Sequence, residues 1–261
     1  MSFFEIWAAG GLAVLVYMTL IWIASVIKRD ASIVDIFWGL GFVALSVVYF
    51  ILAEDGYIGR KILILALAGV WGLRLSGYIL ARNWGRGEDP RYQNWRRQYG
   101  KNYWWISYFQ VFLLQGAIMW LISATLLAAH YFDAPDTLTP LDVLGAMLWT
   151  IGFFFEAVGD WHLKRFKANP ANAGQVLDSG VWSYTRHPNY FGDATQWWAY
   201  YLIALSTGWG ALTIFGPAIM TYLLINVSGV AMLERSMKQK PKYADYIART
   251  SAFFPRIPKE S

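Results

Sequence analysis

Apolar residues fill seven long stretches of the chain, and polar segments separate these stretches from one another. They are residues 4–27, 33–53, 62–80, 107–129, 141–165, 189–206 and 211–234. Each holds about 18 to 25 residues, enough for an α-helix to cross ~30 Å of hydrocarbon at about 1.5 Å per residue. The pattern therefore predicts an all-α bundle of seven transmembrane helices, in which Pro217 bends the last helix.

The composition supports a polytopic membrane protein rather than a soluble one. Hydrophobic residues make up 57% of the 261 residues, and charged residues only 15%, against about 25% in soluble domains. The chain has no cysteine, which excludes disulfides and thiolate chemistry. Its three histidines, His130, His162 and His187, are too scattered along the sequence to indicate a metal site.

Basic residues are distributed unevenly between the two sides of the predicted bundle. Of the 22 Lys and Arg residues, all but Arg60, Lys61 and Arg74 fall on alternate connections or in the C-terminal tail. The positive-inside rule then places the N-terminus outside and the C-terminus in the cytoplasm. The net charge of +5 is assigned to this topology and not to nucleic-acid binding. We expect one membrane-embedded domain over residues 1–261, with an N-terminal part that contains the basic loop (1–105) and a C-terminal part (106–261).

Several ionisable residues fall inside the predicted helices, where each charge costs roughly 2.5–3.5 kcal/mol. At 100° per residue they form shared polar faces. The faces are Trp71, Arg74, Tyr78 and Arg82 on the third helix, Glu156, Asp160 and Lys167 on the fifth, and Asn189, Asp193 and Gln196 on the sixth. These faces and Asp35 lie toward the cytoplasmic helix ends, which predicts one polar cavity open to the cytoplasm. The alternative is a set of buried ion pairs, such as Arg74 with Asp160, that only hold the bundle together.

The stretch from Ser183 to Trp198, SYTRHPNYFGDATQWW, begins the sixth helix. Pro188 suits a first helical turn, where its missing N–H costs nothing. Free backbone N–H groups there, together with Arg186 and His187, suit an anion. Asn189 can bond a purine, amide or ribose edge, and Asp193 can accept from a ribose hydroxyl or a carboxamide. No Ser/His/Asp or Cys/His hydrolytic set is apparent.

Arginines gather in the connection between the third and fourth helices, from Arg82 to Arg97. Planar guanidinium groups suit phosphate binding. The alternative is that these arginines orient the protein in the membrane and contact lipid headgroups. The single GxG at residues 85–87 is too weak to indicate a dinucleotide-binding Rossmann domain, because no strand precedes it.

Four motifs together resemble the steroid 5α-reductase family, especially its bacterial members. They are RHPNYFGD, the tail MLERSMKQKPKYADYIARTSAFFP, the early SIVDIFWGLGF and the loop RNWGRGEDPRY. The resemblance is most specific from about Phe153 to the C-terminus. It implies a seven-helix, NADPH-dependent enzyme of the membrane that reduces the Δ4 double bond of a 3-oxo steroid. It also implies a bacterial inner-membrane location, a monomer, and an apolar steroid-like substrate drawn from membrane lipid.

The resemblance also implies roles for individual residues. Asp35 would correspond to the family's catalytic acid. The family's catalytic tyrosine falls on or near Trp71, which cannot donate a proton in the same way, so Tyr78 or a water would take that role. Trp38 and Trp71 would line the substrate pocket. The cofactor-binding residues would be Arg74, Arg82, Glu156, Asp160, Lys167, Arg186, His187, Asn189, Tyr190, Asp193, Glu234 and Tyr246. Glu156 stands where the family has asparagine, and Asp193 where it has glutamate. The family's tail histidine has no clear counterpart; Glu234 or Arg235 lies nearest.

Two other classes of function remain open. The RHPxY signature also occurs in membrane methyltransferases that bind S-adenosylmethionine, such as the isoprenylcysteine carboxyl methyltransferases. Those enzymes typically have fewer helices and a paired glutamate in the last helix, where this chain reads Glu234-Arg235. A non-enzymatic lipid or sterol transporter or structural bundle is the third class, and it predicts no nucleotide binding.

Overall fold

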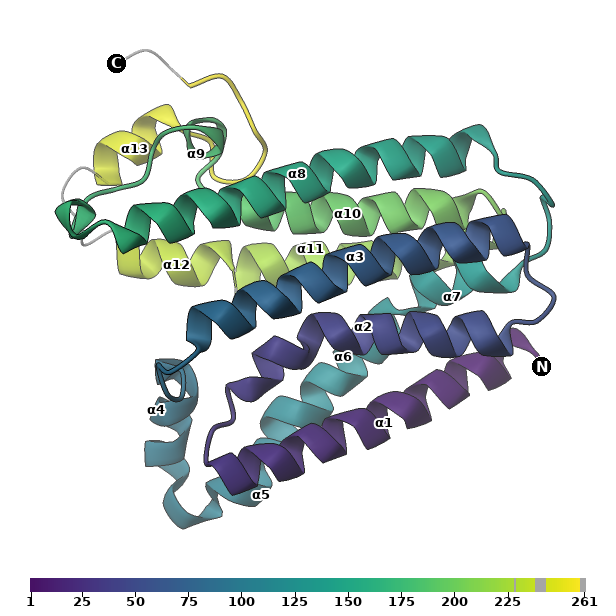
Figure 1. The fold of residues 1–261 in the computed structure, drawn as a ribbon, viewed down its shortest axis with the longest axis horizontal. Helices are drawn as coiled ribbons and strands as arrows, with labels where there is room; N and C mark the ends of the chain where they lie inside the picture. Colours follow the sequence, from purple (N-terminus) through teal and green to yellow (C-terminus); the bar gives the residue numbers. More distant parts are fainter. Residues whose placement is uncertain (228, 238–242, 259–261) are drawn as a thin grey trace. The chain divides into compact units, whose positions relative to one another are not determined.

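The computed structural model of the chain describes residues 1–227, 229–237 and 243–258. Among these residues the regular structure is helical, with no strand beyond one isolated bridge between Thr185 and Ser251. Figure 1 shows the order of the helices along the chain. The prediction of an all-α fold is confirmed. The part of the tail motif at residues 238–242 lies outside the described residues.

Six helical segments in the described chain are long and apolar enough to cross a membrane. They are Phe3–Lys28, Ile33–Leu52, Ile58–Asn83, Pro90–Tyr131, Pro140–Ala168 and Trp209–Val227. The predicted span 189–206 corresponds to helix α10 (Pro188–Leu205), which is not one of the six because Asn189, Asp193 and Gln196 reduce its hydropathy. Six such helices indicate an integral membrane protein. The seventh span and the orientation stay predictions.

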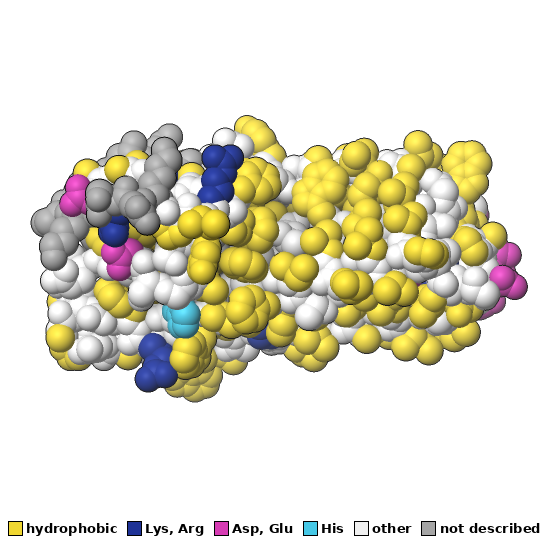
Figure 2. Space-filling model, turned by 90° about the horizontal axis from the view of Figure 1, so that it is seen from above, with side chains coloured by type: hydrophobic (Ala, Val, Ile, Leu, Met, Phe, Trp, Pro, Cys, Tyr) yellow, Lys and Arg dark blue, Asp and Glu magenta, His cyan; other side chains and the backbone are white. Residues whose placement is uncertain are grey.

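Exposed apolar side chains agree with a lipid environment. Large hydrophobic residues are exposed along the predicted spans, among them Leu20 at 61%, Leu73 at 60% and Met147 at 61%. In Figure 2 hydrophobic side chains cover most of the visible face, and few charged side chains interrupt them. Water would disfavour a surface of this kind, whereas hydrocarbon does not.

The residues group into two compact units. The first consists of Met1–Thr139 and Ala204–Thr213, and the second of Pro140–Ile203 and Ile214–Ser261. The prediction that residues 1–261 act as one reductase domain stays a prediction.

The first unit begins with three long helices, α1 (Phe3–Lys28), α2 (Ile33–Leu52) and α3 (Ile58–Asn83). Helix α2 packs along both α1 and α3. The α2–α3 contact depends on two glycines, since a Cβ on Gly39 would lie 2.7 Å from the Gly72 carbonyl oxygen. Close backbone approach through small residues is a common way for membrane helices to pack.

The chain after α3 is more helical than its polar sequence predicts. It forms α4 (Pro90–Tyr99), η1 (Gly100–Asn102), α5 (Tyr103–Ser107), η2 (Tyr108–Leu113), α6 (Leu114–Ile122) and α7 (Ala124–Tyr131). The segment 81–102, predicted as one long polar connection, therefore contains a helix of ten residues. Helix α4 forms because Asp89 caps its N-terminus and Pro90 occupies its first turn.

The second unit is built on α8 (Pro140–Ala168) and α10. The remaining elements are η3 (Pro170–Asn172), α9 (Val181–Tyr184), α11 (Phe215–Tyr222), η5 (Leu223–Val227), α12 (Val230–Met237) and α13 (Tyr243–Arg249). Helices α8 and α10 approach so closely at Gly192 that a Cβ there would lie 2.4 Å from the Gly152 carbonyl oxygen. This close approach brings the polar faces of the two helices together.

Candidate functional site

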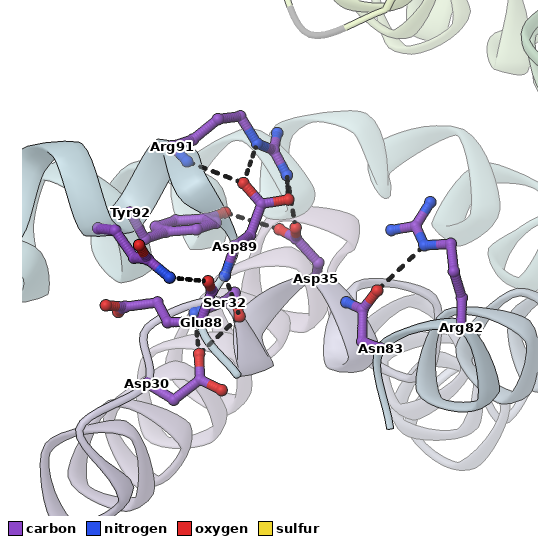
Figure 3. A network of polar contacts seen from close by, with 10 residues as sticks. Asp30, Ser32, Asp35, Arg82, Asn83, Glu88, Asp89, Arg91 and Tyr92 are labelled. Carbon is purple, nitrogen blue, oxygen red and sulfur yellow. Dashed lines mark hydrogen bonds and ion pairs between the residues drawn. The ribbon is translucent and has the colours of Figure 1, made fainter. Parts of the chain in front are cut away.

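A partly buried carboxylate near the start of α2 anchors the polar cluster of the first unit. Asp35 accepts a hydrogen bond from the Tyr92 hydroxyl at 2.7 Å and one from the Arg91 guanidinium at 2.8 Å. Figure 3 shows both side chains reaching Asp35 from α4. The Asp35 side chain is 18% exposed and that of Arg91 39%. We call Asp35, Asp89, Arg91 and Tyr92 the Asp35 cluster.

Asp89 holds Arg91 in place within this cluster. Its carboxylate accepts from the Arg91 backbone N–H and from the Arg91 Nε, each at 2.9 Å. Burial alone would raise the pKa of the Asp89 carboxyl, but the bonds from Arg91 outweigh burial and the pKa is lowered. Arg91 therefore bridges two carboxylates, and its guanidinium is oriented before any ligand binds.

A second ion pair fixes the same loop to the α1–α2 turn. The Glu88 carboxylate receives two bonds from Arg96, both at 2.8 Å, and a third from the Ala31 backbone N–H at 2.8 Å. The Asp89 backbone N–H also donates to the Ser32 hydroxyl at 3.2 Å. Two of the arginines predicted from sequence as a phosphate site, Arg91 and Arg96, are therefore bonded to carboxylates of the protein itself.

The polar face predicted on the third helix lies on α3, which is continuous from Trp71 to Arg82. Trp71 is fully buried and packs against Phe42, with ring centroids 5.8 Å apart; Trp38 contacts the same phenylalanine at 5.4 Å. Trp38 and Trp71 therefore belong to the packed contact between α2 and α3. Arg74 and Tyr78 are partly buried one turn apart, and the Arg82 guanidinium lies over the Tyr78 ring.

Two pairs of side chains connect α8 and α10 in the second unit. Gln196 donates from Nε2 to the Glu156 carboxylate at 2.6 Å, and Asn189 donates from Nδ2 to Asp160 at 3.1 Å. Glu156 is 2% exposed, Asp160 5% and Gln196 0%. These four residues, which we call the α8–α10 ladder, show that the polar faces of the fifth and sixth predicted helices meet. The single polar cavity open to the cytoplasm stays a prediction. Asp193 is partly buried one turn from Asn189.

Arg186 is the centre of a network that ties the tail to the turn before α10. Its Nε and Nη2 donate to one oxygen of Glu234 at 2.8 and 2.6 Å, and its Nη1 donates to the Thr250 carbonyl. The side chains of Arg186 and Glu234 are 8% and 17% exposed. Tyr246 donates to the Trp182 carbonyl in the same network. Arg186, predicted to bind phosphate, has its charge matched by Glu234.

His187 adds no positive charge to this network at neutral pH. Burial lowers the pKa of its imidazole to about 4, although the Glu234 carboxylate 3.5 Å away acts in the opposite direction. The ring stacks on Tyr190 at a centroid distance of 5.8 Å. Lys167 is exposed near the end of α8. Of Arg186 and His187, the two basic residues expected beside the anion, only Arg186 is charged at neutral pH.

Sequence reasoning missed the partners of Asp35. Arg91 and Tyr92 lie in the segment EDPRY, where the acid–proline pair at Asp89 and Pro90 was a readable signal for a helix start. No sequence signal connected that helix with Asp35, 56 residues earlier. Among the described residues, no group of His, Asp and Glu side chains could hold a metal ion.

Comparisons with known proteins place this geometry in a family. Residues 21–250, which include the Asp35 cluster, the α8–α10 ladder and the Arg186 network, match the family described as "Protein of unknown function (DUF1295)". An uncharacterized protein of Schizosaccharomyces pombe is 25% identical over 267 residues, covering 91% of this chain and 76% of that protein. A probable O-methyltransferase, ustE of Ustilaginoidea virens, is 27% identical over 139 residues, covering 53% of this chain and 44% of that protein. No solved structure matches the chain.

Proposed function

The chain belongs to the DUF1295 family, and we propose that it reduces the C=C bond of an apolar enone with NADPH as the hydride donor. The observation that carries this proposal is the Tyr92 hydroxyl, held 2.7 Å from a partly buried carboxylate that Arg91 also contacts. Reduction of an enone places negative charge on its carbonyl oxygen, so a preorganised hydrogen-bond donor there stabilises the transition state.

Within the Asp35 cluster we assign each side chain a separate task. When substrate is bound, the Tyr92 hydroxyl turns its single proton from Asp35 to the carbonyl oxygen as the enolate develops. Asp35 orients the phenol and, through Arg91, is tied to Asp89. This assignment differs from a direct role for Asp35 as the acid, because Asp35 already accepts bonds from two donors. With this assignment Tyr92 takes the role of the catalytic tyrosine, which Trp71 cannot fill, and Tyr78 becomes a secondary candidate for that role.

The α8–α10 ladder suits the nucleotide. Gln196 is completely buried, and its Oε1 finds no hydrogen-bond partner among the described residues while its Nε2 is bound to Glu156. A buried acceptor of this kind fits a carboxamide N–H, and Asp160 fits a ribose hydroxyl. NADPH, when bound, would supply the hydride for the β-carbon of the enone, and water would supply the proton for the α-carbon. Lys167, on the same helix α8 as Asp160, is the basic residue we assign to its phosphates.

The substrate class follows from the membrane setting and from the resemblance to steroid 5α-reductases. We propose a 3-oxo-Δ4 steroid or a similar terpenoid enone that enters from the bilayer. The same proposal includes seven spans, a cytoplasmic cofactor side, a bacterial inner-membrane location and a monomer.

The second candidate is methyl transfer from S-adenosylmethionine to a lipid or prenylated substrate. It is favoured by the similarity to the probable O-methyltransferase of Ustilaginoidea virens over 53% of this chain. In that case the ladder would hold a methionine-containing nucleotide, and no proton donor would be needed at a carbonyl oxygen. Tyr92 would then be dispensable for turnover.

A binding experiment separates the two candidates from each other and from a non-enzymatic role. Detergent-solubilised protein is incubated with NADPH or with S-adenosylmethionine, and affinity is measured by isothermal titration calorimetry. We expect the protein to bind NADPH and, once progesterone is added, to oxidise it, which is seen as a loss of NADPH absorbance at about 340 nm. Binding of S-adenosylmethionine alone would establish the second candidate, and binding of neither nucleotide would leave the transporter class.

Two conservative variants test the chemistry. Tyr92→Phe removes only the hydroxyl, and we expect it to lower turnover by about 10²–10³, the usual effect of losing one oxyanion donor, with NADPH affinity unchanged. The control is Tyr99→Phe, a partly buried tyrosine on the same helix α4. Equal turnover in the two variants would remove Tyr92 from the mechanism.

A further inference from the structure

The first unit contains a cavity of about 180 Å³ at the C-terminal end of α1. Its wall includes Ser25 and Arg29 from the end of α1, Arg96 from α4, and Tyr103, Trp104 and Ser107 from α5. The lining contains two arginines and no acidic residue. The volume is large enough for several waters or one phosphate ester. It lies outside the Asp35 cluster, to which the enzyme's chemistry is assigned above.

One buried polar atom on this wall lacks a hydrogen-bond partner among the described residues. Tyr103 is 2% exposed, and its hydroxyl makes no hydrogen bond to any of the described residues. The neighbouring hydroxyls are satisfied, since Ser25 donates to the Trp22 carbonyl and Ser107 to the Trp104 carbonyl. A buried hydroxyl without a partner is unfavourable. An acceptor oxygen inside the cavity would satisfy it.

The charge on the wall favours an anionic acceptor. Arg96 lies over the Tyr103 ring, 4.7 Å from its centroid, and its charge is matched by Glu88. Arg29 is exposed beside it, and within the described chain its guanidinium has no recorded hydrogen bond or ion pair. Arg29 therefore supplies the uncompensated positive charge. A phosphate group could accept from Tyr103 and pair with Arg29 at once.

We propose that this cavity binds the phosphate of an anionic membrane lipid. The surroundings favour a lipid over a soluble phosphate, because exposed apolar side chains of α1 continue from the cavity: Ile23 at 44%, Val26 at 37% and Ile27 at 77%. These would accommodate acyl chains. The phosphate would then sit at the end of a membrane-spanning helix, at the level of the lipid headgroups.

Aromatic residues beside the cavity support the same depth. Trp22 stacks on Trp104, with ring centroids 6.2 Å apart, and donates from its indole N–H to the Trp104 carbonyl at 2.8 Å. Trp104 is 54% exposed. Tryptophans concentrate at the boundary between hydrocarbon and headgroups. Basic residues at the end of a membrane-spanning helix attract anionic lipids; Lys28 is the last residue of α1 and Arg29 follows it directly.

The test measures lipid binding to protein purified in detergent and washed free of lipid. Phosphatidylglycerol, phosphatidylcholine or inorganic phosphate is added, and bound lipid is counted by native mass spectrometry, with thermal stability as a second readout for all three. We expect phosphatidylglycerol to bind and to stabilise the protein. Tyr103→Phe and Arg29→Gln should each weaken this binding about tenfold, the effect of losing a charge-assisted hydrogen bond.

Matched controls separate the cavity from general lipid attraction. Tyr108→Phe removes a hydroxyl that pairs with Thr19 instead of lining the cavity, and Arg97→Gln removes an exposed arginine that bonds Asn94. Both should bind phosphatidylglycerol as the unaltered protein does. Equal binding by all four variants would overturn the proposal. Stabilisation by inorganic phosphate alone, or equal binding of phosphatidylcholine, would overturn the assignment to an anionic lipid.

Discussion

The ion pair between Arg186 and Glu234 gives the sharpest prediction about stability. Glu234→Gln keeps the size of the side chain but removes the charge that matches a guanidinium only 8% exposed. Removing one partner of a buried pair usually costs 3–5 kcal/mol. Here the glutamine oxygen can still accept one bond from Arg186, and Glu234 is 17% exposed. We therefore expect a loss of about 2–3 kcal/mol, at or just below the lower limit of that range.

Thermal unfolding in detergent measures this loss. At about 2–4 °C per kcal/mol for a chain of this size, Tm should fall by roughly 5–10 °C, as followed by tryptophan fluorescence. The tail should also become more accessible, because Arg186 holds the Thr250 carbonyl and the Ser251 carbonyl accepts from the Arg186 backbone N–H. Limited digestion with trypsin should therefore cut faster after Arg249 in the variant.

An exposed pair in the same unit provides the comparison. Arg249 and Asp178 lie 3.0 Å apart with side chains 40% and 46% exposed. Exposed pairs contribute about 0–1 kcal/mol because water and salt screen them. Asp178→Asn should lower Tm by no more than about 4 °C. If both variants lower Tm equally, burial is not what makes the Arg186 pair important, and the reasoning above is wrong.

Three further predictions follow from the clusters. Burial lowers the pKa of the His187 imidazole to about 4. Between pH 6.5 and pH 4 only the unfolded chain takes up this proton, so the free energy of unfolding should fall by up to about 3 kcal/mol as the pH drops. His187→Gln should flatten that part of the curve of Tm against pH. Gly192→Ala should cost about 1–3 kcal/mol by overpacking against α8, measured as a lower Tm, whereas Gly77→Ala, which meets open space, should not. Asp35→Asn should abolish progesterone reduction and leave NADPH affinity near normal. Asn189→Ala should weaken NADPH binding in calorimetry. The opposite pattern would exchange the roles assigned to the Asp35 cluster and the α8–α10 ladder.

The roles of the arginines change once their partners are known. Sequence alone treats Arg91, Arg96 and Arg186 as available for phosphate, because each lies in a basic, polar segment. In the folded chain each guanidinium is bonded to a carboxylate: Asp35 and Asp89, Glu88, and Glu234 respectively. Their first function is to hold loops and the tail in place. Anion binding then falls to residues such as Arg29, whose charge is not matched within the described chain.

The amino-acid sequence alone determined that the long apolar segments are helical and which faces of the second unit are polar. Long apolar runs can satisfy their backbone hydrogen bonds in a membrane only as helices, so the spans were readable without a structure. The spacing of Glu156 and Asp160, and of Asn189 and Gln196, also showed that each pair shares a helix face. The contacts across the ladder confirm that these faces meet.

Tertiary structure alone decided which side chains complete each cluster. Arg91 and Tyr92 reach Asp35 only because the polar segment after α3 forms a short helix and returns to the α1–α2 turn, where Glu88 accepts from Ala31. A polar loop has no hydrophobic period that specifies its path, and its course depends on hydrogen bonds between residues more than fifty positions apart. The unpartnered hydroxyl of Tyr103 has the same origin, because whether a group is buried without a partner depends on everything packed around it.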